Sequence, residues 1–152
     1  MFPIQNGVPH RSAPFVTWSL IATNVAVFLY QVSLSPPALD RFLVDYALIP
    51  GRYFVPLPFV PEPTLSDYLP FATNMFLHGG WLHLILNMWT LFLFGPTVED
   101  RMGGARYLLF YLFCGIAAST AHAYFNATSF VPALGASGAI AGVIGAFVRL
   151  FP

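Results

Sequence analysis

The stretch LHGGWLHLILNMWTLFLFGPTV, residues 77–98, contains no Asp, Glu, Lys or Arg and decides the class of fold. A bilayer core of about 30 Å is crossed by about 20 helical residues. An uncharged, apolar run of this length therefore predicts a membrane-spanning helix. Three further apolar windows lie at residues 15–32, 105–125 and 133–150.

Composition supports the same interpretation. Of the 152 residues, 57% are hydrophobic and 8% are charged, whereas soluble domains carry about 25% charged residues. The formal net charge is zero, so no basic surface suggests nucleic acid, and nucleic-acid partners are excluded. We predict an all-α membrane protein, a polytopic helical bundle that forms one domain over residues 1–152.

The connection between the first two predicted spans, residues 33–76, is rich in proline, aromatic and aliphatic residues. It is too apolar for a solvated linker, and we expect a structured loop at the membrane interface.

Arginine placement predicts the orientation of the bundle. The N-terminus, the loop after the second span and the end of the fourth span must share one side, and they hold Arg11, Arg101, Arg106 and Arg149. By the positive-inside rule this side is cytoplasmic. We therefore expect a multi-pass protein of the bacterial plasma membrane with a cytoplasmic N-terminus.

Polar side chains from three spans converge at one depth near the opposite face. His78, His83 and Asn87 lie in the outer half of the second span, Ser137 lies near the start of the fourth, and His122 lies near the end of the third. Such groups are costly inside a membrane and are functional hypotheses by default. Each has a structural alternative: interfacial histidines, an asparagine that joins helices, or a small packing serine.

The motif GASG, residues 135–138, suits a nucleophile. Gly135 and Gly138 permit close backbone approach, and a serine in the first helical turn lies beside unpaired N–H groups at the positive end of the helix dipole. His83 and Asn87, one helical turn apart, would complete an oxyanion hole at Ser137. This geometry predicts acyl transfer.

Other catalytic classes fit less well. The soluble hydrolase elbow GxSxG is not matched, because Ala139 holds its fifth position. No acid lies beside the histidines as a zinc protease requires, although a site with three histidines remains an alternative.

Small residues continue along the fourth span at Gly138, Ala141, Gly142 and Gly145. They predict a closely packed helix, for which the other three spans offer no obvious candidate.

These residues resemble the rhomboid family of intramembrane serine proteases. NMFLHGGWLHLILNMWTLFLFG, residues 74–95, is similar to the family's second-span pattern H-x(4)-H-x(3)-N, VEDRMG to its following loop, and GASG to its nucleophile motif.

The resemblance implies a six-helix bundle, of which four helices are present here. It also implies that Ser137 is the nucleophile, that His83 and Asn87 stabilise the oxyanion together with the Ser137 N–H, and that His78 supports the site. Glu99 and Arg101 match a loop pair to which we assign a structural role. The implied substrates are transmembrane proteins cleaved near the non-cytoplasmic face, without a metal or organic cofactor.

One feature departs from the family pattern. The general base of the family is a histidine on the sixth span, whereas this sequence ends at Pro152, after the fourth. We expect the chain to be incomplete at its C-terminus and inactive alone; His122 could substitute as base but matches no family base. The alternatives are a non-catalytic rhomboid-like protein that binds transmembrane clients, and a four-span scaffold.

Overall fold

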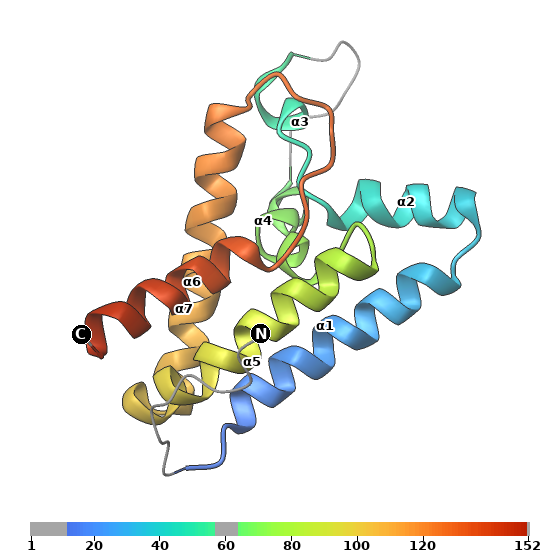
Figure 1. Ribbon diagram of the computed structural model, residues 1–152. Coiled ribbons are helices and arrows are strands. Elements are labelled where there is room, and N and C mark those ends of the chain that lie inside the picture. The colour runs from blue at the N-terminus through green and yellow to red at the C-terminus, as the bar shows by residue number, and fades with distance from the viewer. Residues whose placement is uncertain (1–11, 57–63, 152) are drawn as a thin grey trace.

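The computed structural model describes residues 12–56 and 64–151 and has a helical bundle at its centre (Figure 1). Its four main helices are α1 (Phe15–Ser33), α5 (Trp81–Met102), α6 (Gly104–Phe125) and α7 (Ser137–Leu150). The predicted helical membrane bundle is thus confirmed. Helices α1, α5 and α6 are long and apolar enough to cross a bilayer, whereas α7 is a shorter apolar helix. Arg11 lies outside the described residues.

The connection from α1 to α5 is structured over its described residues. It contains α2 (Pro36–Tyr46), α3 (Gly51–Phe54), α4 (Pro70–Thr73) and two 3-10 turns, Leu65–Tyr68 and Asn74–Phe76. Helix α2 folds back over the C-terminal end of α1 (Figure 1).

The predicted bounds of the second span, residues 77–98, were shifted by four residues from those of α5. The helix begins only at Trp81, because Gly80 has extended backbone (φ 163°, ψ 169°), and it ends before Gly103, whose φ of +81° favours glycine. His78 consequently precedes the helix and does not lie within it. Glu99 and Arg101, expected in the following loop, lie in the last part of α5.

The predicted start of the fourth span at residue 133 was also wrong. Helix α7 begins at Ser137 and has 14 residues, or about 21 Å at 1.5 Å per residue. Ahead of it, the non-helical chain descends from the end of α6 (Figure 1). Leu48 and Ala133 exchange backbone hydrogen bonds of 3.1 and 2.7 Å, and Gly51 N–H donates to the Ser129 carbonyl at 2.7 Å. Non-helical backbone is tolerated at membrane depth only where protein satisfies its polar groups, and this pairing does so for both backbone groups of Ala133 and for the Ser129 carbonyl.

Glu99 joins the end of α5 to the beginning of α1. Its buried carboxylate accepts hydrogen bonds from Val16 N–H at 2.9 Å, from Thr17 N–H at 2.7 Å and from the Thr17 hydroxyl at 2.7 Å. These N–H groups belong to the first turn of α1, where no intrahelical acceptor exists and negative charge is favourable. The structural role assigned to Glu99 therefore has a physical basis.

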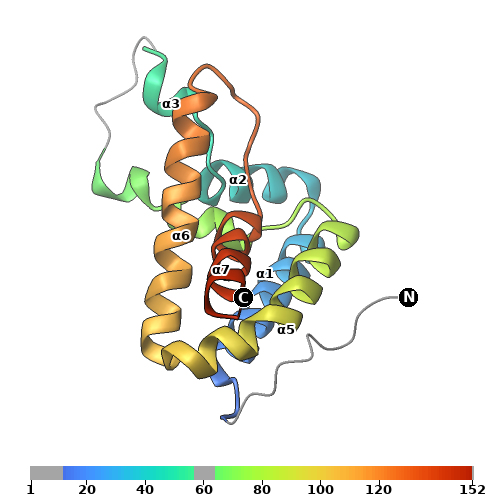
Figure 2. The ribbon, with the colours of Figure 1, turned by 60° about the vertical axis from the view of Figure 1, so that its left-hand side comes forward.

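Helix α7 lies between α6 and α5 (Figure 2). The expectation that its small residues have no partner among these helices was wrong for two of them. A Cβ added at Gly138 would overlap Ala118, and one at Gly142 would lie 2.6 Å from the Cβ of Cys114. Both partners belong to α6. Ala141 is exposed, and a Cβ at Gly145 would meet nothing within 4 Å.

We expect Glu99→Ala to lower the free energy of unfolding by about 3 kcal/mol, because it leaves buried donors of α1 without an acceptor. Denaturant titration in detergent micelles measures this. Asp100→Asn serves as the control, since Asp100 is more exposed and accepts from Ser12 N–H at 2.8 Å. Equal losses for the two variants would contradict the role given to Glu99.

We also expect Gly142→Ala to destabilise the bundle by about 1–3 kcal/mol, because the added methyl group overpacks against Cys114. Gly145→Ala, three residues further along the same helix, has open space and gains helix propensity of up to about 1 kcal/mol. The same titration compares the two. A result in which Gly145→Ala is the more damaging variant would be inconsistent with this packing.

Candidate active site

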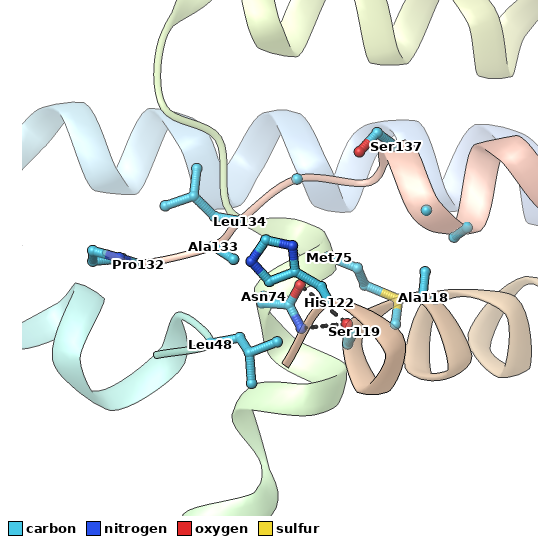
Figure 3. A pocket seen from close by; sticks show the side chains of 14 residues that line it. Leu48, Asn74, Met75, Ala118, Ser119, His122, Pro132, Ala133, Leu134 and Ser137 are labelled. Carbon is cyan, nitrogen blue, oxygen red and sulfur yellow. Dashed lines mark hydrogen bonds between the residues drawn. The ribbon is translucent and has the colours of Figure 1, made fainter. Parts of the chain in front are cut away.

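Ser137 is the first residue of α7 and is exposed. It borders a cavity of about 470 Å³ formed by α6, α7, the turn before α5 and the segment that precedes α7 (Figure 3). Since Ile140 N–H donates to the Ala136 carbonyl at 2.9 Å, the N–H groups of residues 137–139 precede the first intrahelical bond of α7. The predicted position of a serine at a helix N-terminus is therefore observed.

His83 lies against the backbone immediately before Ser137. A Cβ added at Gly135 would come within 2.6 Å of both Cε1 and Nε2 of His83, and Gly135 has a φ of +121°. Glycine is thus required at this position for close approach as well as for backbone conformation. Gly79 N–H donates to Nδ1 of His83 at 3.4 Å, which assigns the proton of a neutral ring to Nε2, one of the two ring atoms nearest Gly135.

Asn87 is buried one helical turn after His83 on the same face of α5. Its Nδ2 donates to the His83 carbonyl at 2.9 Å. An amide nitrogen carries two hydrogens, so this bond positions the side chain and leaves a second N–H for a ligand.

The imidazole ring of His78 packs against that of His83. The ring centroids are 5.1 Å apart with an interplanar angle of 65°. The backbone of His78 is held by Gln31 of α1, which accepts from His78 N–H at 3.1 Å and donates to its carbonyl at 3.2 Å. His78 is 2% exposed, and neither of its ring nitrogens has a hydrogen-bond partner among the described residues. Burial, together with the neighbouring His83, lowers the pKa of His78 to about 4.

His122 and Ser137 border the same cavity from α6 and α7 (Figure 3). Two residues that the sequence analysis missed form its polar floor: Asn74 Nδ2 donates to the Ser119 hydroxyl at 2.9 Å, and that hydroxyl donates to Asn74 Oδ1 at 3.3 Å. Both residues are buried. The sequence signal for Asn74 was a polar side chain beside an apolar span, and that for Ser119 was a polar side chain within one.

The structure therefore places the His78 ring against the His83 ring, and the His83 ring against Gly135, two residues before Ser137. Over residues 12–56 and 64–151 it records no hydrogen bond from the Ser137 hydroxyl to His83, Asn87 or His122. His122 Nδ1 lies 3.5 Å from Asn126 Nδ2. Within the described part of the chain, no group of three or more His, Cys, Asp or Glu side chains is arranged to hold a metal.

Comparison with known proteins identifies similar sequences. Residues 66–152 match the Rhomboid domain family. The chain is 30% identical over 142 residues to "Rhomboid protein 1, mitochondrial" of Saccharomyces cerevisiae, with 90% of this chain and 37% of that protein covered. It is 27% identical over 146 residues to "Rhomboid protease AarA" of Providencia stuartii, covering 88% of this chain and 50% of that protein. It is 42% identical over 83 residues to "Rhomboid protease GluP" of Bacillus subtilis, covering 55% and 16%.

We expect the free energy of unfolding to fall as the pH is lowered from about 6.5 toward about 4, because His78 in the unfolded chain takes up a proton that the buried ring resists. His78→Gln removes this contribution, so the difference between wild type and variant should depend on pH over that window. Denaturant titration at several pH values measures it. His122→Gln, at an exposed histidine, is the control, and a larger pH-dependent difference for that variant would rule out the assignment to His78.

Proposed function

The chain belongs to the rhomboid family, and we propose that it carries the nucleophile and oxyanion site of an intramembrane serine endopeptidase. In this proposal the Ser137 hydroxyl attacks a peptide carbonyl of a transmembrane substrate. His83 and Asn87, with the Ser137 N–H, hold the oxyanion that forms. The chain spans half or less of the length of the relatives described above, so the activity is proposed for the whole protein.

The observation that carries this proposal is the contact of the His83 ring with Gly135, two residues before Ser137. It brings the Nε2 proton of His83 to the backbone turn that presents the serine. An oxyanion hole requires donors fixed before charge develops, because donors that reorient during the reaction cost energy. His83 is fixed by Gly79 at one ring nitrogen and by the packing of His78, and Asn87 is fixed by the His83 carbonyl.

A serine nucleophile also needs a base to accept its proton. The family resemblance assigns this role to a histidine of a sixth span. Among the described residues, His122 is the histidine that remains a candidate for the general base, because it borders the same cavity as Ser137. Any test of activity must therefore use the complete natural protein.

For topology, we propose that the end of the bundle that carries Arg101, Arg106 and Arg149 faces the cytoplasm. These residues lie at the end of α5, the start of α6 and the end of α7. Ser137 would then lie toward the opposite face, and cleavage would occur there. The similarity extends to a mitochondrial protein as well as to bacterial ones, so a bacterial plasma membrane remains a proposal.

One observation favours a second function, the binding of transmembrane clients without cleavage. Among the described residues, the Ser137 hydroxyl has no hydrogen bond to a histidine that would activate it. The serine is nevertheless exposed and borders a cavity, so a client segment has room to bind there. A serine-directed fluorophosphonate probe distinguishes the two, because only an activated serine reacts with it.

We expect Ser137→Ala in the complete protein to reduce cleavage of a transmembrane reporter in liposomes by at least about a thousandfold and to abolish labelling by the probe. The reason is that no other group replaces the attacking oxygen.

Ser119→Ala is the matched control for this test, because it removes a hydroxyl from the same cavity and retains Ser137. Labelling should persist in this variant. Cleavage that survives Ser137→Ala, or labelling that is lost only with Ser119, would refute the proposed nucleophile.

A further inference from the structure

A second cavity, of about 460 Å³, lies between the C-terminal end of α1 and helix α2, away from the cavity at Ser137. Its lining includes these polar, charged and aromatic residues: Tyr30, Ser35, Arg41, Phe42, Asp45 and Tyr46. We propose that this cavity binds the headgroup of a zwitterionic phospholipid that carries a primary ammonium group, a phosphoethanolamine lipid.

The position of the cavity suits a lipid headgroup. Helix α1 has 19 residues, or about 28 Å at 1.5 Å per residue, close to the thickness of the bilayer core. When α1 crosses the membrane, its C-terminal end therefore reaches the headgroup region. Tyr30 stands in the last turns of α1, and α2 folds back over this end (Figure 1). Acyl chains could continue from the cavity along α1 toward the bilayer centre, where Leu29 is 50% exposed.

The charges of the cavity match those of the headgroup. Arg41 and Asp45 lie one turn apart on α2, both exposed and both at the cavity. Among the described residues the structure records no ion pair between them. The order of a cation followed by an acid is also the weaker one for such a pair on a helix. Each group can therefore take an external partner, the guanidinium a phosphate and the carboxylate an ammonium.

Aromatic rings complete the site. Phe42 packs against Tyr30 and Tyr46, with ring centroids 5.5 and 4.9 Å apart. Ring faces attract cations, and tyrosine favours the membrane interface. A primary ammonium can donate hydrogen bonds to Asp45, which a choline group cannot. The cavity thus selects ethanolamine over choline, and selects a zwitterion over a purely anionic lipid.

Native mass spectrometry of the complete protein in detergent tests this with short-chain phosphatidylethanolamine, phosphatidylcholine and phosphatidylglycerol. We expect a saturable preference for the ethanolamine lipid. Arg41→Gln should weaken its binding about tenfold, and Arg41→Lys should restore part of it. Asp45→Asn should weaken ethanolamine binding about tenfold and leave phosphatidylglycerol binding unchanged.

Asp40→Asn is the matched control, because Asp40 is an exposed acid on the same helix that does not border the cavity. Circular dichroism verifies that each variant folds. Glycerophosphoethanolamine, which lacks acyl chains, should compete weakly if the lipid is the ligand; full competition would mean a soluble ligand and would overturn the proposal. Equal effects of the Asp40 and Asp45 variants, or equal binding of all three lipids, would overturn it as well.

Discussion

The carboxylate of Glu99, near the C-terminal end of α5, accepts hydrogen bonds from the first turn of α1. The position of α1 against α5 depends on this contact. A backbone donor that is buried in the protein without an acceptor cannot turn to water, as the Thr17 N–H could not if Glu99 were absent. The first turn of any helix presents such donors, and α1 has no side-chain cap of its own. Glu99 supplies the missing acceptor and fixes α1 against α5. Close to this contact, a Cβ at Gly95 would come within 2.8 Å of both Thr17 and Tyr107, so α1, α5 and α6 meet where a side chain is absent.

The need to satisfy backbone polar groups away from water also explains the position of Ser137. The chain between α6 and α7 is not helical. Backbone groups of Ser129 and Ala133 bond to the segment around Leu48, and the Asn74 carbonyl accepts from Gly135 N–H at 2.9 Å. This pairing lets α7 begin below the end of α6. A helix N-terminus, with its unpaired N–H groups, is thereby brought into the protein at the point where Ser137 borders the cavity.

Close packing holds this arrangement in place. Gly138 and Gly142 let α7 approach α6, while Gly135 lets the preceding turn approach His83. In each case, the absence of a side chain on one segment makes room for a side chain of its neighbour. These glycines therefore set both the distance between α6 and α7 and the distance between His83 and the turn before Ser137. The exposed face of α7 at Ala141 and Gly145 takes no part in this packing.

The sequence by itself determined the fold class, the bounds of α1 and α6 to within a residue, and the presence of polar side chains such as His83 and Ser137 beside or within apolar spans. It could do so because an apolar run of a given length has one solution in a bilayer, and because polar groups in such a run stand out. It failed at the starts of α5 and α7, where hydropathy continues across the boundary but the backbone does not remain helical. Those starts, the bond from Glu99 to α1, and the pairing of Asn74 with Ser119 depend on contacts between distant segments. Only the tertiary structure decided them, because a hydrogen-bond donor or acceptor in the sequence does not reveal which distant group will satisfy it.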